Sequence, residues 1–186
     1  MINLKDIYAK TAIPALKAEF GYTNSMAVPR VVKVVLNTSF GKASVTKTND
    51  EQKKIAEAVL EDISRIAGQR AALTRAKKSI ATFKLRQGMA IGAKVTLRGQ
   101  RAYHFLDRLI HVVLPRSRDF RGIRPESVDN KGNISIGIKE HMFFPEISPE
   151  KIRFPFGLEI TVETTAQSKT EGLALFRALG FPFASS

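Results

Sequence analysis

The sequence contains no cysteine. That absence excludes disulfides, thiolate metal sites and cysteine nucleophiles, and it is typical of proteins in a reducing compartment. No apolar run approaches the ~18 residues that would suggest a membrane span, and the first ten residues lack the apolar stretch of a secretory signal. We therefore expect a cytoplasmic protein with no membrane partner.

Common catalytic and nucleotide-binding motifs are also missing: there is no GxxxxGK[ST], no GxSxG and no HExxH. The histidines are His104, His111 and His141. His104 and His111 are seven residues apart on one predicted helix, too far to share a metal directly. A satisfied or surface histidine is the better interpretation for each. No pair of carboxylates singles out an acid and a base. We expect no catalytic residue, metal, cofactor or small-molecule substrate.

Acidic residues are absent from one long stretch. No Asp or Glu lies between Asp62 and Asp107, and the intervening window, 63–106, holds ten of the 30 Lys and Arg residues. The whole chain carries a net charge of +13, whereas outside the window 20 basic residues face 17 acidic ones. This distribution predicts a nearly neutral body with one basic face for a polyanion.

Hydrophobic periodicity predicts a mixture of helices and strands. Capping-box patterns begin two helices, at Thr48–Glu51 and at Ser168–Glu171, Pro14 should kink the first helix or begin a second, and Pro115 should end the third. Helices are expected over 4–20, 48–68, 99–113 and 168–180, and strands over 31–36, 69–74, 93–98, 134–138 and 158–162. These elements do not alternate regularly, and the strands around 93–98 and 134–138 alternate apolar and polar residues. We predict one α+β domain over 1–186, with an antiparallel or mixed sheet that has helices on one face.

The segment TRAKKSIATFKLRQGMAIG, residues 74–92, is here called the basic arm. Its cations are Arg75, Lys77, Lys78, Lys84 and Arg86. Its hydroxyl and amide side chains can donate to phosphate oxygens, and Phe83 can stack on a base. Gly88 and Gly92 should let the tip bend sharply. A solvated face is the plain alternative. A membrane-surface helix is disfavoured because the segment has two glycines and no apolar helical stripe.

Two further surfaces are candidates for nucleic-acid contact. Alternation places Lys94, Thr96 and Arg98 on one strand face, and Asn37 at the end of one strand and Gln69 at the start of another add neutral groups that can reach ribose hydroxyls and base edges. An exposed strand face is the alternative. The second surface is the loop after Pro115, where acidic neighbours make an ordinary solvated loop an equal alternative. Its cations are Arg116, Arg118, Arg121 and Arg124.

Several separate segments closely resemble one protein family. They are VPRVVKVVLN (28–37), IAGQRAALTRAKKSIATFKLRQGMAIGAKVTLRGQRAYHFLDRL (66–109), LPRSRDFRG (114–122), GNISIGIKEHMFFPEI (132–147) and the final GFPF (180–183). The family is the bacterial-type large-subunit ribosomal protein five, which holds 5S ribosomal RNA. The resemblance runs nearly end to end, so it is more specific than any single motif.

The resemblance implies an antiparallel sheet backed by helices, similar in topology to RNA-recognition domains. The aromatic strand signature of those domains is absent, so hydrogen bonding and shape are expected in place of base stacking on the strands. The resemblance also implies that Asn37, Gln69 and Thr96 touch 5S ribosomal RNA, that the basic arm reaches the elbow of peptidyl-site transfer RNA, and that part of the surface bridges to a small-subunit head protein. Neighbouring large-subunit proteins and 23S ribosomal RNA complete the expected partners.

One alternative of a different class remains at this stage. An RNA-processing or RNA-modifying enzyme would use the same basic face. It would also need a cofactor loop or convergent catalytic groups, and the sequence shows neither.

Overall fold

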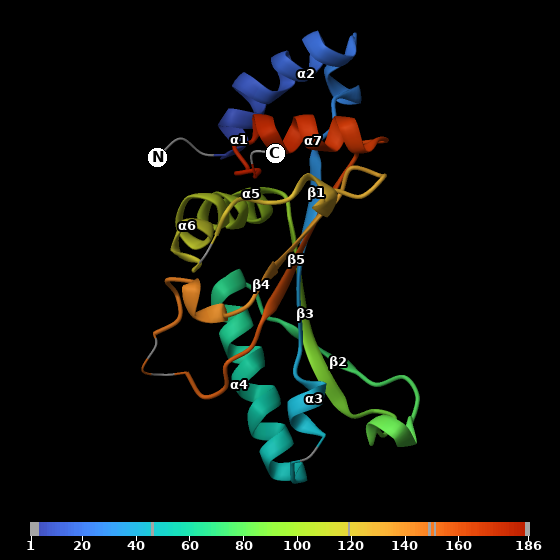
Figure 1. The fold of residues 1–186 in the computed structure, drawn as a ribbon, viewed down its shortest axis with the longest axis vertical. Helices are drawn as coiled ribbons and strands as arrows, with labels where there is room; N and C mark the ends of the chain where they lie inside the picture. The colour runs from blue at the N-terminus through green and yellow to red at the C-terminus, as the bar shows by residue number, and fades with distance from the viewer. Residues whose placement is uncertain (1–3, 46, 119, 149, 151, 185–186) are drawn as a thin grey trace. The chain divides into compact units, whose positions relative to one another are not determined.

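A computed structural model describes residues 4–45, 47–118, 120–148, 150 and 152–184. Its strands form a five-stranded sheet in the order β2-β3-β1-β5-β4 (Figure 1). The strands are β1 (Val31–Ser39), β2 (Ala72–Arg75), β3 (Ala90–Arg98), β4 (Ile134–Ile138) and β5 (Leu158–Thr164). Along the chain the order is β-α-β-β-α-β, with β4 added before the last strand. The predicted α+β class with an antiparallel sheet is confirmed.

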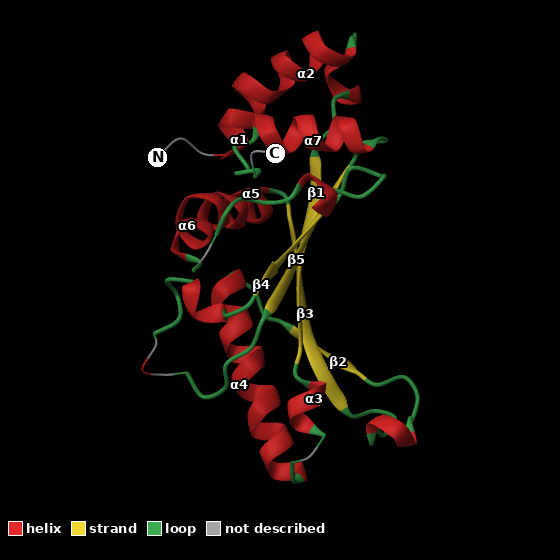
Figure 2. Ribbon diagram, viewed as in Figure 1, coloured by secondary structure: helices red, strands yellow, loops and turns green. Residues whose placement is uncertain are grey.

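Helices connect and flank these strands (Figure 2). The α-helical segments are α1 (Leu4–Ile7), α2 (Ile13–Phe20), α3 (Gly41–Ser44), α4 (Asn49–Ala67), α5 (Gln100–Arg108), α6 (Leu114–Arg116) and α7 (Lys169–Ala178). Two π-helical turns, η1 (Tyr8–Ala12) and η4 (Leu109–Val113), join α1 to α2 and α5 to α6. Short 3₁₀ turns are η2 (Ser25–Ala27), η3 (Ala81–Phe83), η5 (Pro125–Ser127) and η6 (His141–Phe143).

The chain clusters into two compact units. The first comprises segments within 1–34, 97–136 and 161–186, and the second comprises 35–96 and 137–160. A single domain over 1–186 therefore stays a prediction. Each unit is described separately below.

The π-helical turns explain how the first unit tolerates proline inside helices. The amide of Ile13 donates to the carbonyl of Tyr8, five residues earlier, and the amide of Leu114 does the same to Leu109. Each following proline then falls in the first turn of a new α-helical segment, where its missing N–H has little cost. A second helix thus begins beside Pro14 as expected. Pro115 ends its helix to within one residue, because α6 stops at Arg116.

In the first unit, α1 packs on α5, and α2 packs on α7. Leu4, Leu16, Leu106 and Phe176 are buried there. The Tyr8 hydroxyl donates to the Pro29 carbonyl at 3.1 Å and fixes the start of β1 against the N-terminal helices.

The second unit contains the best predicted helix of the chain. The backbone amide of Thr48 donates to the Glu51 carboxylate at 3.0 Å, which completes the predicted capping box. That hydrogen bond is the main reason why the pKa of Glu51 is lowered. The apolar stripe of α4 is buried through Val59 and Ile63, and Gly68 ends the helix with φ +62°. Local signals therefore determined this element.

Strand alternation is confirmed, but several predicted boundaries move. Buried and exposed side chains alternate along β3, β4 and β5. However, β1 continues to Ser39, so Asn37 lies inside it, and β2 begins only at Ala72, so Gln69 precedes it. In addition, β3 begins at Ala90, three residues before the predicted start. Both ends of the basic arm belong to paired strands, because Thr74 and Arg75 of β2 pair with Gly92 and Ala90 of β3.

Candidate nucleic-acid interface

The polar face of β1 and β3 carries several predicted residues of the second unit. Asn37 and Thr96 are half-buried, and Lys94 is exposed. These strands are neighbours in the sheet. At one end the backbone amide of Phe40 donates to the Ile91 carbonyl at 3.0 Å, which anchors β1 against β3. Asn37 lies three residues before Phe40, and Lys94 lies three residues after Ile91. Because the strands run antiparallel, these equal distances from the anchor place Asn37 and Lys94 close together.

Gln69 joins this group although it precedes β2. Its side-chain amide donates to the carbonyl of Thr96 at 3.2 Å, across 27 residues of sequence. The register of β2 on β3 places Ala72 opposite Lys94, and the small side chain of Ala72 leaves that part of the face open. Arg98, the last residue of β3, is exposed in the first unit. In the second unit, the structure thus brings together Asn37, Gln69, Lys94 and Thr96.

An acidic residue also lies on this face, and the sequence analysis missed it. Glu159 of β5 is exposed, and its carboxylate Oε2 accepts a hydrogen bond from the Asn37 side-chain amide at 3.4 Å. In the first unit, Glu163 of the same strand pairs with Lys33 at 2.7 Å. The alternation of buried Leu158, Ile160 and Val162 could have placed both acids on the polar face. No local pattern indicates that Glu159 meets Asn37.

The backbone of the basic arm forms a hydrogen-bonded hairpin. The Ala76 amide donates to the Met89 carbonyl at 2.8 Å, and the Gly88 amide donates to the Ala76 carbonyl at 2.9 Å. Nearer the tip, Ile80 and Leu85 exchange two backbone hydrogen bonds. In Figure 1 this green segment extends beyond the ends of β2 and β3.

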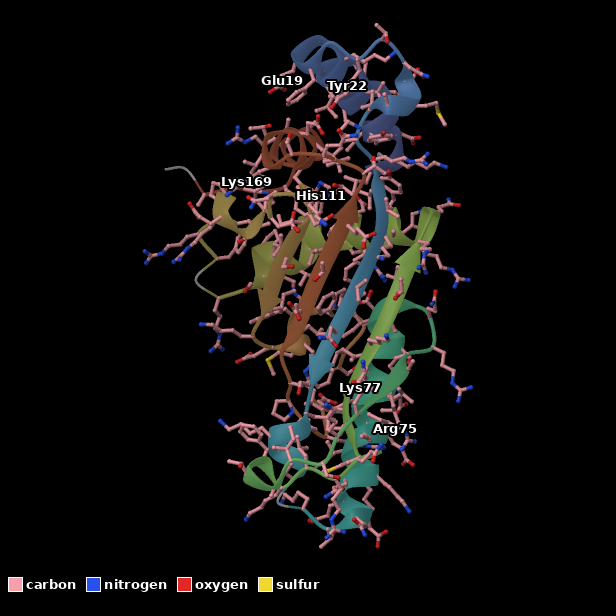
Figure 3. The ribbon with its side chains drawn as sticks, turned by 90° about the vertical axis from the view of Figure 1, so that its right-hand side faces the viewer. Glu19, Tyr22, Arg75, Lys77, His111 and Lys169 are labelled. Carbon is pink, nitrogen blue, oxygen red and sulfur yellow. The ribbon has the colours of Figure 1, made fainter. Side chains whose placement is uncertain are left out.

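Cations dominate the surface of the arm. Lys77, Lys78, Lys84 and Arg86 are all exposed. Arg75 is exposed too, but its guanidinium donates to the Gly88 carbonyl at 2.9 Å, so it also helps to close the hairpin. Figure 3 shows Arg75 and Lys77 where β2 passes into the arm.

The tip of the arm presents apolar side chains to solvent. Phe83 is 63% exposed and Ile80 is 43% exposed. Lys84 has φ +52°, a left-handed conformation that reverses the chain directly after Phe83. The predicted sharp bend therefore forms at Lys84 as well as at Gly88, which has φ +83°.

Gly92 has a different role from the one predicted. It lies inside β3 and has no left-handed backbone angle. A Cβ atom there would collide with the Thr38 carbonyl and lie 2.7 Å from the Thr74 hydroxyl. Glycine is required because neighbouring strands approach closely, so the prediction that Gly92 bends the tip was wrong.

A hollow of about 940 Å³ separates the arm from the start of α4. Its cationic side chains are Lys47, Lys84 and Arg86, and its neutral hydrogen-bonding side chains include Thr48 and Gln87. No acidic residue of the described chain lines it. Both walls of this hollow are therefore compatible with a phosphate backbone.

The arginine-rich loop belongs to the first unit. Arg116, Arg118, Arg121 and Arg124 are exposed. The Ile123 amide donates to the Pro182 carbonyl at 2.7 Å, which ties the loop to the C-terminal segment. The loop is thus tied at Ile123, and the four arginine residues are exposed.

His104 and His111 are surface histidines as predicted, whereas the buried Nε2 of His141 has no hydrogen-bond partner among the described residues. His104 is exposed, and His111 lies 3.1 Å from the Asp107 carboxylate. His141 is buried, stacks on Phe156 with ring centroids 4.0 Å apart, and lies 3.6 Å from Asp62. No group of three or more metal-ligating side chains occurs among the described residues.

Within the described ranges, no helix is long and apolar enough to cross a membrane.

An α+β fold with a polar sheet face and an acid-free basic hairpin is the arrangement of a nucleic-acid-binding protein. Comparisons with known proteins make this class specific.

Residues 24–86 match the family model described as ribosomal protein L5, and residues 90–183 match the model that describes the C-terminus of the same ribosomal family. The chain is 49% identical over 183 residues to the large ribosomal subunit protein uL5 of Desulfotalea psychrophila, and 50% identical over 183 residues to that of Herpetosiphon aurantiacus. Each match covers 98% of this chain and 99% of the relative. The uL5 protein of a Thermoanaerobacter species is 48% identical over 184 residues.

The chain belongs to the ribosomal protein L5 family. It is therefore a structural, rRNA-binding component of the large ribosomal subunit that serves translation in the cytoplasm. This family is not enzymatic, which excludes the alternative of an RNA-processing enzyme.

Proposed function

We propose that this chain binds 5S ribosomal RNA through the polar sheet face and anchors it in the central protuberance. Asn37, Gln69 and Thr96 supply neutral hydrogen-bonding groups, and Lys94 supplies charge. Arg98 extends the set along β3. Hydrogen bonds to Glu159 and to the Thr96 carbonyl hold two of these side chains in place. Fixed neutral groups can read base edges and ribose hydroxyls, which a loose cationic surface cannot do.

The basic arm contacts peptidyl-site transfer RNA in this proposal. Its exposed cations bind backbone phosphates, and Arg75 contributes while it also closes the hairpin. Exposed Phe83 is available to stack on a base or a base pair. The acid-free hollow beside the arm admits a phosphate backbone along its inner side.

Further partners are assigned more coarsely. Arg116, Arg118 and Arg121 contact 23S ribosomal RNA, because they are exposed guanidinium groups on a backbone that is tied at Ile123. Neighbouring large-subunit proteins pack around the chain, and part of its surface bridges to a small-subunit head protein.

The observation that carries the 5S assignment is the hydrogen bond from the Gln69 side chain to Thr96 of β3, the strand that neighbours β1 with Asn37. Thr96→Val removes one hydroxyl without changing volume or charge. Specific binding to 5S ribosomal RNA should weaken by about 1–3 kcal/mol, since an RNA group loses its partner, while binding to an unrelated RNA stays the same.

Lys94→Ala provides the comparison. It should weaken both RNAs similarly and reduce the slope of log affinity against log salt by about one. Filter binding or fluorescence anisotropy at four salt concentrations measures both variants. If Thr96→Val leaves 5S affinity intact, the sheet face is not the 5S site.

A further inference from the structure

Glu159 is out of place on a face that binds a polyanion. A carboxylate repels phosphates, and this one is exposed next to Asn37. Its contact joins residues 122 apart in sequence, so it depends on the packing of β5 beside β1. The contact is therefore a feature of the folded sheet and does not follow from the sequence of either strand alone.

The chemistry of the contact fixes the orientation of the Asn37 amide. An ionised carboxylate has only acceptors, so the Glu159 carboxylate must face the NH₂ group of Asn37 and not its carbonyl. The Asn37 Oδ1 then turns away from Glu159. Among the described residues, no group donates a hydrogen bond to this oxygen.

We propose that Glu159 is a positioning residue that makes Asn37 present a hydrogen-bond acceptor to RNA. The RNA group recognised by Asn37 is then a donor, either a ribose 2′-hydroxyl or an exocyclic amino group of a base. This inference rests on the proposed binding of 5S ribosomal RNA to the sheet face.

Glu159 also has a consequence for specificity. Without its partner, Asn37 can rotate by half a turn and offer its NH₂ group to any phosphate or carbonyl oxygen. The carboxylate prevents that orientation and repels RNA that lacks the matching donor. Glu159 thus lowers affinity for all RNA and lowers it least for the correct one.

Glu159→Gln tests the proposal, because glutamine keeps the shape but can face Asn37 with either its oxygen or its nitrogen. The control is Glu163→Gln, which removes the same charge from β5 at a residue that pairs with Lys33. Both variants should bind an unrelated RNA a few-fold more tightly. The ratio of 5S affinity to unrelated-RNA affinity should fall about five- to tenfold for Glu159→Gln and stay constant for Glu163→Gln.

A double variant separates positioning from simple charge repulsion. In the Asn37→Ala background, Glu159→Gln should not lower the ratio further, because the side chain that it orients is gone. If the effects of the two substitutions on the ratio are additive, the proposal is overturned.

RNA analogues distinguish the two donors. Pools of 5S ribosomal RNA with random 2′-deoxy substitution, or with analogues that lack the amino group of guanosine, adenosine or cytidine, are selected for binding. The wild-type protein should show interference at a site in one kind of pool that Asn37→Ala does not show. Interference that is identical for both proteins in every pool contradicts the proposal.

The outcomes also separate this inference from the proposed function. If Asn37→Ala leaves 5S specificity unchanged, the sheet site and the role of Glu159 both fail. If Asn37→Ala lowers specificity but Glu159→Gln does not, the sheet site stands and only the positioning role fails. Thermal unfolding of each variant checks that the substitutions leave the fold intact.

Discussion

The polar sheet face and the basic arm are both polar surfaces of the second unit, but they are built in opposite ways. On the sheet face, Asn37 and Gln69 are half-buried, and a hydrogen bond to another strand holds each side chain. Asn37 donates to Glu159 of β5, and Gln69 donates to Thr96 of β3. On the arm, Lys77, Lys78 and Arg86 are exposed. The sheet face even includes an acid, Glu159, whereas the arm has none.

This difference supports the proposal that the two surfaces bind two kinds of RNA partner. Held amide and hydroxyl groups give geometric discrimination and suit a partner that stays in place. Exposed cations attract phosphates over several ångströms and accept many geometries, which suits a partner that arrives and leaves. Strands β2 and β3 connect the two regions.

The largest predicted effect is a loss of stability on substitution of Gly92, which lies on the strand shared by the sheet face and the arm. Gly92→Ala forces a Cβ against the Thr38 carbonyl, so the strand that carries both Lys94 and the arm must shift. We expect a loss of about 2–3 kcal/mol in the free energy of unfolding, measured by urea denaturation.

Gly137→Ala is the control for this prediction. A Cβ at Gly137 would meet nothing within 4 Å, so the change should be within about 0.5 kcal/mol. Equal stability of the two variants would show that the close approach at Gly92 is not a constraint.

A smaller predicted effect is a dependence of the free energy of unfolding on pH, caused by buried His141. Burial lowers the pKa of His141, so the folded protein binds fewer protons at this residue than the unfolded chain. Stability should therefore fall as the pH drops from about 7.5 through the ordinary histidine range to about 5.5. Burial raises the pKa of Asp62, which opposes this loss as the pH approaches the titration range of that carboxyl.

One histidine variant sharpens this prediction. His141→Gln should flatten the dependence of unfolding free energy on pH, measured by urea denaturation at several pH values. A wild-type profile that rises toward acid would contradict the sign of the His141 effect.

Features set by neighbours in sequence were predictable. The Thr48 capping box, the buried stripe of α4 and the alternation along β3 depend on local spacing, and the structure confirms each of them. The basic character of the arm was also predictable, because its cations lie close together in the sequence.

Features that depend on contacts between distant segments were not predictable. Neither the Asn37–Glu159 contact nor the collision that makes Gly92 necessary has a local signature. The second function of Arg75, which closes the hairpin at Gly88, also requires the folded backbone. The π-helical turns before Pro14 and Pro115 are a further case, because no local pattern indicates their backbone hydrogen bonds.

The central claim is that the sheet face and the arm hold different RNAs. Its most direct test is the triple variant Lys77/Lys78/Arg86→Ala, which keeps Arg75 to close the hairpin and Lys84 at its left-handed position. On one preparation, affinity for isolated 5S ribosomal RNA and the dissociation rate of peptidyl-site transfer RNA from reconstituted ribosomes are both measured. We predict dissociation roughly tenfold faster, from the loss of three phosphate contacts, with 5S affinity within about threefold of wild type. A collapse of 5S binding with normal transfer-RNA retention would contradict the account and make the arm the 5S site.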